Sequence, residues 1–121
     1  MALLTHRDHE ERPWGFSERF TLNEPATVKI MRIKPHQRFS LQTHAKRAEF
    51  WRILSGNGTV TVNGLEHLAK VSDEFEILVG APHRAAAGEE ELCFLEIALG
   101  DFNEHDETRL EDDYGRTSPT P

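Results

Sequence analysis

Short β-rich segments recur along this chain at nearly regular intervals, and glycine or proline separates most of them. The most informative segment is Thr59–Val62, which runs directly into Asn63 and Gly64. An Asn-Gly pair flanked by strand-forming residues is the strongest short signal for a β-hairpin. No segment before residue 101 has the 3.6-residue period of a convincing helix. This organisation predicts an all-β chain folded as an antiparallel sandwich or barrel.

Further strands are expected wherever β-branched, aromatic and aliphatic residues cluster. Their expected bounds are Thr27–Ile33, Phe39–His44, Glu49–Leu54, Phe75–Val79 and Leu92–Leu99. Side chains alternate between the two faces of a strand, so Glu49 is expected to share a face with Trp51. By the same rule Glu96 shares a face with Phe94 and Ala98. Two carboxylates are therefore expected on strand faces that are otherwise apolar.

The two ends of the chain differ in composition from its β-rich middle. Residues 1–11 are polar with mixed charge, and we expect them to form a flexible N-terminal arm. Residues 12–116 are expected to form one domain, and residues 117–121 a C-terminal tail. Within the domain, the acidic stretch Asp101–Asp113 has room for a short helix, and Trp14 is expected in the core.

Charge and apolar content exclude several classes of protein. The formal net charge of −7 argues against general nucleic-acid binding. No apolar run approaches the length of a membrane span, and the N-terminus lacks an apolar signal region. The single cysteine, Cys93, lies in an apolar run and is expected to be a buried small hydrophobic residue. We therefore expect a cytoplasmic protein with no membrane or nucleic-acid partner.

Gln42, His44, Glu49 and His83 are four potential metal ligands and the strongest functional signal in the chain. Three neutral donors and one carboxylate leave a divalent ion with about one net positive charge, so the ion remains a Lewis acid. Because glutamine is a hard and weak donor, substrate-orienting zinc or manganese chemistry is favoured over oxygen activation at iron. Each residue alone has a plain structural alternative, such as a turn at His83 or a surface carboxylate at Glu49.

Lys46 and Arg47 lie between His44 and Glu49 in the sequence. Two cations at the mouth of a site suit an anionic substrate such as a phosphate ester, which Arg47 is able to grip with two hydrogen bonds. A solvated basic turn is the alternative. Glu96 is either a general base near the metal or part of a structural ion pair. We expect Lys46 and Arg47 to bind substrate and, together with Glu96, to take part in catalysis.

Several short motifs follow one another along residues 11–116. They are Arg12-Pro-Trp-Gly15, Lys34-Pro35, Ser40-Leu-Gln-x-His44, Arg47-Ala-Glu49-x-Trp51, Ser55-Gly56, Gly80-x2-His83-Arg84 and Asp113-Tyr-Gly-Arg116. In content and order they resemble the C-terminal domain of type II mannose-6-phosphate isomerases. That domain is a cupin, often fused behind a mannose-1-phosphate guanylyltransferase.

The resemblance implies an all-β cupin, a double-stranded β-helix or jelly-roll barrel, in which the four ligands hold a divalent metal. It also implies interconversion of mannose 6-phosphate and fructose 6-phosphate. Arg47 matches the family arginine near the metal, and Arg116 is placed where it helps to hold the phosphate. Zinc is the expected metal, with manganese, iron and nickel as alternatives. The expected partners are a sugar phosphate and a second copy of the chain in a homodimer.

The chain departs from the family pattern at a few positions. Phe50 stands where the family usually has histidine, and it is expected to remove a polar group close to the site. Leu78, His36 and Ala87 replace a proline, a glycine and an asparagine of the family. Two further functions are compatible with such changes: a non-catalytic metal-binding cupin that binds a sugar or sugar phosphate, and an iron dioxygenase, which fits Gln42 less well.

Overall fold

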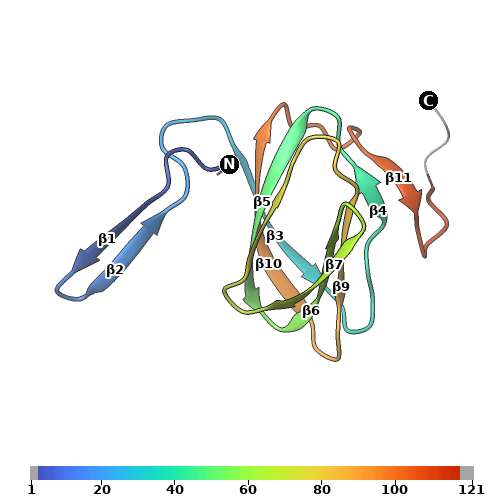
Figure 1. Cartoon of the computed structure of the whole chain (residues 1–121), viewed down its shortest axis with the longest axis horizontal. Coiled ribbons are helices and arrows are strands. Elements are labelled where there is room, and N and C mark those ends of the chain that lie inside the picture. The colour runs from blue at the N-terminus through green and yellow to red at the C-terminus, as the bar shows by residue number, and fades with distance from the viewer. Residues whose placement is uncertain (1–2, 118–121) are drawn as a thin grey trace.

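The computed structural model of the protein describes residues 3–117, and within that range its regular structure consists of strands without any helix (Figure 1). The strands are β1 (Asp8–Arg12), β2 (Gly15–Arg19), β3 (Thr27–Ile33), β4 (Leu41–Thr43), β5 (Arg47–Ser55), β6 (Asn57–Val62), β7 (Leu65–Lys70), β8 (Glu74–Ile77), β9 (His83–Ala87), β10 (Leu92–Gly100) and β11 (Thr108–Glu111). The expectation of an all-β chain is confirmed. Over the same residues there is no helix that could cross a membrane.

Two antiparallel sheets form a flattened barrel around one apolar core. One sheet has the strand order β3-β10-β5-β8 and the other the order β11-β4-β9-β6-β7. Trp51 and Phe94 from the first sheet pack with Val60 and Ala85 from the second, and all four are buried. Burial of apolar surface stabilises the fold by roughly 25 cal/mol per Å², and this shared core therefore holds the two sheets together.

Strand β5 lies at the centre of its sheet and is buried on both faces. Glu49 and Trp51 point into the barrel, whereas Phe50 points to the outer face and packs with Leu4 and Ile97. The N-terminal segment thus covers part of the outer face of this sheet. Phe50 belongs to this outer cluster and is separated from the inner face by the strand itself.

The hairpin predicted at Asn63-Gly64 is confirmed. Val62 pairs with Leu65 across a two-residue turn, with φ of 52° at Asn63 and 80° at Gly64. Left-handed backbone at both positions is what a type I′ turn requires, and asparagine and glycine adopt it at the lowest cost.

The expected loose arm over residues 1–11 is wrong at residues 8–11. They form β1, which pairs along its whole length with β2 to make a separate hairpin. Backbone pairing across the Pro13-Trp14 turn orders this polar segment. Trp14 is 76% exposed at that turn, so its expected place in the core is also wrong. Residues 1 and 2, and residues 118–121 of the expected tail, lie outside the described residues.

No helix forms in Asp101–Asp113 either. The segment contains a turn around residues 104–105, followed by β11, which pairs with β4. The carboxylate of Asp106 accepts hydrogen bonds from the backbone N–H groups of Ala45 and Lys46, both at 2.9 Å. These hydrogen bonds join residues about sixty positions apart in the sequence. In a local helix the same carboxylate would have been exposed to solvent.

Two glycines with the same backbone conformation provide a test of the packing. Gly56 (φ 82°) lies against residue 91, and a Cβ there would come within 1.9 Å of the Glu91 carbonyl oxygen, whereas Gly64 (φ 80°) has open space around it. We expect Gly64→Ala to lower the free energy of unfolding by about 1 kcal/mol, from backbone strain alone. Gly56→Ala is expected to cost more than about 3 kcal/mol, because backbone must move. Urea unfolding measures both, and equal losses would contradict the close approach.

Candidate metal centre

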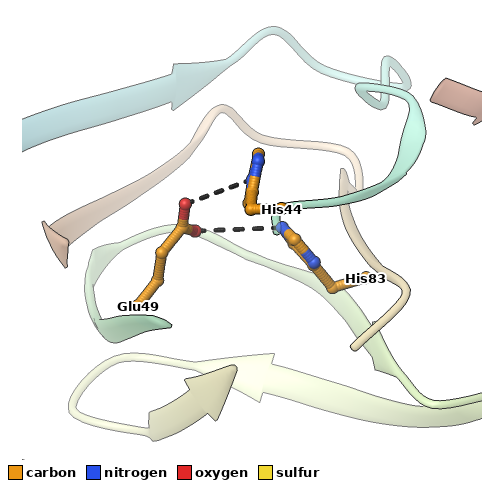
Figure 2. A group of neighbouring side chains, drawn as sticks. All are labelled: His44, Glu49 and His83. Atoms are coloured by element: carbon orange, nitrogen blue, oxygen red, sulfur yellow. Dashed lines mark ion pairs between the residues drawn. The ribbon is translucent and has the colours of Figure 1, made fainter. Parts of the chain in front are cut away.

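His44, Glu49 and His83 converge inside the barrel (Figure 2). Nε2 of His44 lies 3.3 Å from Oε2 of Glu49, and Nε2 of His83 lies 3.8 Å from Oε1. All three side chains are buried, and one ligand atom from each lies within 4.8 Å of the others. Ligand atoms that share an ion at about 2.1 Å stand roughly 3 to 3.5 Å apart. The spacing of this cluster is therefore close to that of a metal site.

Backbone carbonyls fix the orientation of both imidazoles. Nδ1 of His44 donates to the carbonyl oxygen of Asp106 at 2.7 Å, and Nδ1 of His83 donates to that of Ala81 at 2.8 Å. A hydrogen bond at Nδ1 sets the tautomer and leaves the lone pair on Nε2, as metal-ligating histidines require. Both Nε2 atoms lie toward Glu49, and that of His44 also accepts a hydrogen bond from Arg47.

His83 carries the clearest sign that the cluster fits a metal. Its Nε2 is buried and has no hydrogen-bond partner among the described residues. A buried polar atom without a partner costs free energy, and a cation at the centre of the cluster would satisfy it. Burial also lowers the pKa of His83, against the opposing effects of the Ala81 carbonyl and Glu49, so the ring stays neutral.

Glu49 is the one ligand of the cluster that carries a formal charge. Burial by itself would raise the pKa of Glu49, but the neighbouring His83 and His44, together with hydrogen bonds from Arg47 and Trp51, leave it below its ordinary value. Nε1 of Trp51 donates to Oε1 of Glu49 at 2.9 Å. The carboxylate is thus ionised and held in place.

Gln42 lies directly opposite His83 in the pairing of β4 with β9. Side chains of directly opposed residues leave the same face of a sheet, so Gln42 faces the same interior as His83. Its Oε1 accepts a hydrogen bond from the hydroxyl of Ser40 at 3.2 Å. Its role as a fourth ligand stays a prediction, and the register is compatible with it.

Arg47 is buried within the cluster. Its Nε donates to Oε2 of Glu49 at 3.0 Å, and Nη2 donates to Nε2 of His44 at 3.3 Å. Nη1 donates to the carbonyl oxygen of Asn103 at 3.1 Å, and the guanidinium carbon lies 4.4 Å from the centre of the Phe102 ring. The expected place of Arg47 beside the ligands is therefore found, and a solvated basic turn does not describe it.

Glu96 faces the same interior from β10. It is directly opposite Trp51 in the sheet, on the same face as Glu49 of the neighbouring strand. Burial and the charge of Glu49 raise the pKa of Glu96 to about 7, against the opposing charges of Lys29 and Arg47. Its Oε2 is buried and has no hydrogen-bond partner among the described residues. Among residues 3–117 no ion pair of Glu96 is found, so the arrangement favours the first of the two interpretations, a carboxyl group near the metal site, over a structural ion pair.

Lys46 and Arg116 lie apart from this cluster. Lys46 is exposed and lines a groove of about 280 Å³ with residues 101, 103, 105 and 106. Arg116 is half-exposed and forms an ion pair with Asp112 at 3.0 Å. The pKa of the Arg116 guanidinium is raised, chiefly by the hydrogen bond to Asp112 and to a smaller extent by the negative charge of Glu107.

Arg109 and Asp106 belong to the neighbourhood of the site, although the sequence did not indicate them. Arg109 lies opposite Gln42 in the pairing of β11 with β4, so its side chain leaves the same face as Gln42. It is 31% exposed and forms an ion pair with Glu107 at 2.8 Å. The sequence analysis expected a short helix in this stretch, so it gave no reason to place Arg109 opposite Gln42.

The expectation that Phe50 removes a polar group from the site is wrong. Its ring packs 5.6 Å from that of Phe20 on the outer face of the sheet, on the side opposite Glu49. Residues adjacent in a strand face opposite ways, so the side chain at this position does not contact the cluster. The substitution therefore gives no structural reason for a loss of activity.

Comparison with known protein families gives a match over most of the chain. The family described as mannose-6-phosphate isomerase C-terminal matches residues 2–112. A mannose-1-phosphate guanylyltransferase of Klebsiella pneumoniae is 38% identical over 115 residues, which are 92% of this chain and 24% of that protein. The alginate biosynthesis protein AlgA of Pseudomonas aeruginosa is 37% identical over 109 residues, 88% of this chain and 23% of that protein. The chain thus spans about a quarter of the length of these relatives.

Solved structures share the architecture. The capsular polysaccharide assembling protein CapF of Staphylococcus aureus matches with a TM-score of 0.66 at 17% identity, over 87% of this chain and 32% of that one. A protein of Klebsiella pneumoniae with a double-stranded β-helix domain matches with a TM-score of 0.63 at 20% identity, over 72% and 76% of the two chains. A cupin protein of Bacteroides fragilis matches at 0.58 and 21%, over 67% and 74%. The expected cupin double-stranded β-helix is confirmed.

Metal binding is tested through stability. Zinc at about 100 times its dissociation constant should raise the free energy of unfolding of metal-stripped protein by about 2.7 kcal/mol. In His83→Ala one donor is lost, and we expect the gain at the same zinc concentration to disappear. The exposed His67, changed to alanine, is the matched control and should keep the full gain. Calorimetric titration and elemental analysis give the stoichiometry, and equal zinc binding by both variants would exclude this cluster.

The raised pKa of Glu96 predicts a pH effect on the metal-free protein. Between the ordinary value of 4.5 and about 7 the folded state binds more protons than the unfolded state, so stability falls as pH rises through this window. The contribution is on the order of 3 kcal/mol. Glu96→Gln should abolish it, whereas Glu89→Gln on an exposed loop should not. Denaturant unfolding at pH 5 and pH 8 in a chelator measures the difference, and identical pH profiles for the wild type and Glu96→Gln would refute it.

Proposed function

Because the chain belongs to the mannose-6-phosphate isomerase C-terminal family, we propose that it is a metal-dependent aldose–ketose isomerase of a sugar phosphate, interconverting mannose 6-phosphate and fructose 6-phosphate. One observation carries the proposal. A buried cluster with metal-ligand spacing is hydrogen-bonded to a guanidinium, Arg47, and faces a buried carboxyl group, Glu96, whose pKa burial and the charge of Glu49 raise to about 7. The guanylyltransferase named for the relatives belongs to proteins about four times as long and is not proposed for this chain.

The residues present fit a divalent cation, with zinc as the expected ion. His44, Glu49 and His83 would hold it together with Gln42, and two neutral imidazoles with one carboxylate match the ligand set of zinc. When bound, the ion would act as a Lewis acid on the carbonyl and hydroxyl oxygens of the sugar. Manganese, iron and nickel accept the same donors, so the choice of metal is left to experiment.

The reaction moves one proton between neighbouring carbons. The C2–H proton of the aldose is removed and its electrons form the C1=C2 double bond of the enediol, while the carbonyl electrons move to O1, which takes up a proton. The hydroxyl proton on O2 is then lost as the C2 ketone forms, and the electrons of the double bond take up a proton at C1. Glu96 is proposed to take and return this proton, because its carboxyl group faces the cluster and its pKa of about 7 lies near neutral pH. Arg47 is proposed to stabilise negative charge that develops on the oxygens.

A bound phosphate needs cations within reach of the metal centre. Arg109 is proposed to bind it, since it shares the face of Gln42 and remains partly exposed. Lys46 lines the groove formed with residues 101, 103, 105 and 106. Arg116 interacts electrostatically with Glu107, which also forms an ion pair with Arg109. Lys46 and Arg116 are both proposed as further substrate contacts. A guanidinium suits this role because it donates two parallel hydrogen bonds to a phosphate.

The proposal is tested by turnover and by isotope exchange. Protein loaded in turn with zinc, manganese, iron and nickel is given mannose 6-phosphate in a coupled assay. The same samples in D₂O report exchange of the C2 proton by NMR. We expect turnover with at least one metal, and its loss in Glu96→Gln with metal content unchanged. Arg109→Gln should raise KM about 10- to 100-fold with a smaller change in kcat, because a charge-assisted hydrogen bond contributes about 1.5–3 kcal/mol.

Arg32→Gln is the matched control for Arg109→Gln. Arg32 is exposed and paired with Glu91 on the outer side of β3, so its loss should leave KM unchanged. A folded, metal-loaded protein that exchanges no C2 proton with any of the four metals would overturn the proposal. Thermal stabilisation by mannose 6-phosphate under those conditions would instead identify a non-catalytic binding cupin.

A further inference from the structure

The two imidazoles of the metal centre differ in what their Nε2 atoms contact. Nε2 of His83 has no hydrogen-bond partner among residues 3–117, whereas Nε2 of His44 accepts a hydrogen bond from Nη2 of Arg47 at 3.3 Å. In both rings Nδ1 donates to a backbone carbonyl, so Nε2 is the atom left to bind a metal. A metal ion therefore meets an open donor at His83 and a covered donor at His44.

Arg47 joins two acceptor atoms of the cluster. Nε2 of His44 and Oε2 of Glu49 lie 3.3 Å apart (Figure 2), and each presents a lone pair. Two such atoms at this distance repel each other unless a donor or a cation joins them. The guanidinium is both, because its Nε donates to Oε2 at 3.0 Å while Nη2 donates to Nε2. Arg47 thus contacts the same two atoms that a divalent cation would share.

The loop after β10 holds the guanidinium in this position. The centre of the Phe102 ring lies 4.4 Å from the guanidinium carbon of Arg47, and the carbonyl of Asn103 accepts from Nη1 at 3.1 Å. Phe102 is half-buried and belongs to neither apolar cluster of the described residues. A cation close to an aromatic ring is attracted to it electrostatically, and more strongly where water is excluded. The ring therefore holds a cation rather than filling the core.

The Phe102 ring has a second cationic neighbour on β3. Nζ of Lys29 lies 4.7 Å from the ring centre and forms an ion pair with Oε1 of Glu104, in the same loop, at 3.2 Å. Lys29 lies directly opposite Glu96 in the pairing of β3 with β10. One ring thus contacts both Arg47 and the lysine beside Glu96, and its position does not depend on Arg47 alone.

We propose that Arg47 and the metal ion compete for Nε2 of His44, and that Phe102 is the positioning residue that holds Arg47 in its competing place. On the ring, the guanidinium compensates the charge of Glu49 and covers His44. Binding of a divalent ion through Nε2 requires the hydrogen bond from Nη2 to break, and repulsion between the two cations moves the guanidinium away. The inference concerns metal binding, so it rests on the metal centre and not on the isomerase reaction.

The competition predicts the sign of a change in zinc affinity. A residue that supports a metal ligand through a hydrogen bond strengthens metal binding, and its loss weakens binding about 10- to 100-fold. A competing cation has the opposite effect. Arg47→Met removes the hydrogen bond to His44 and the charge that compensates Glu49, so the dissociation constant for zinc should fall at least about tenfold. Arg32→Met, at an exposed arginine paired with Glu91, removes the same charge elsewhere and should leave it unchanged.

Phe102 is tested without any change of charge. Phe102→Leu weakens the hold on Arg47, and we expect the dissociation constant for zinc to fall about 3- to 10-fold. Phe102→Tyr keeps the ring and should bind zinc as the wild type does. If Phe102 only maintained the shape of the loop, the leucine variant would bind zinc more weakly than the wild type. Phe16→Leu, at an exposed ring of β2, is the control for loss of an aromatic side chain.

Zinc affinities are measured by competition with a chromophoric chelator, and circular dichroism confirms that each variant is folded. A crystal structure of the zinc-loaded protein should place Nη2 of Arg47 beyond hydrogen-bonding distance of Nε2 of His44. Unchanged or weaker zinc binding in Arg47→Met or in Phe102→Leu would overturn the proposal, and so would a zinc-loaded protein that keeps the Arg47 hydrogen bond to His44. Should Arg47→Met fail to fold, the two Phe102 variants decide alone.

These measurements separate the competition at His44 from the proposed function. None of them uses a sugar phosphate, so a protein with the expected affinities but no turnover would reject the isomerase and keep the competition. A wild type that binds no zinc would reject both the metal centre and the competition.

Discussion

The buried carboxylate of Glu49 is the constraint on which the rest of this structure depends. A negative charge inside a barrel core is costly unless donors and cations surround it. Here the surrounding groups are the Trp51 indole, the Arg47 guanidinium and the two imidazoles of His44 and His83. Trp51 is also a central residue of the apolar core, so the same side chain holds the sheets together and orients the carboxylate. The geometry of the site and the packing of the barrel are therefore set by the same contacts.

The ligands come from separate parts of the chain, and the loop after β10 joins them. The backbone carbonyl of Asp106 accepts a hydrogen bond from His44, and its carboxylate accepts from the N–H groups of Ala45 and Lys46. These bonds fix the His44 imidazole and the start of β5 relative to each other. Asn103, in the same loop, accepts from Arg47. Burial would raise the pKa of Asp106, but the two backbone N–H donors and nearby positive charge lower it, so its carboxylate stays ionised as an acceptor. This loop acts on the site through the backbone carbonyls of Asn103 and Asp106 and through the side chains of Asp106 and Phe102.

The sequence predicted those features that follow from local pattern. Strand alternation placed Glu49 and Trp51 on one face and Glu96 on the inner face of its own strand, and the structure has them there. The same alternation rule places Phe50 on the outer face, where the structure has it. The expectation that Phe50 removes a polar group from the site came from comparing single positions with the family motif, without regard to which face of the strand they lie on. The positions of Arg109 and Asp106 depend on the pairing of β11 with β4 across more than sixty residues, for which the sequence carries no local signal. The order of β1 was missed because its residues are polar and only pairing with β2 makes them a strand.

The charge balance of the cluster has a consequence for how the site forms. Arg47 and Glu49 form a buried pair at 3.0 Å, so the ionised ligand already has a cation beside it in the protein alone. Breaking such a pair on one side leaves a buried charge uncompensated, at a cost of about 3–5 kcal/mol. A chain of this size buries enough apolar surface to fold without a structural metal. The fold therefore builds the cluster in advance, with Arg47 compensating Glu49 and His83 presenting a free lone pair, and a metal ion would enter a site whose orientation the barrel has already fixed.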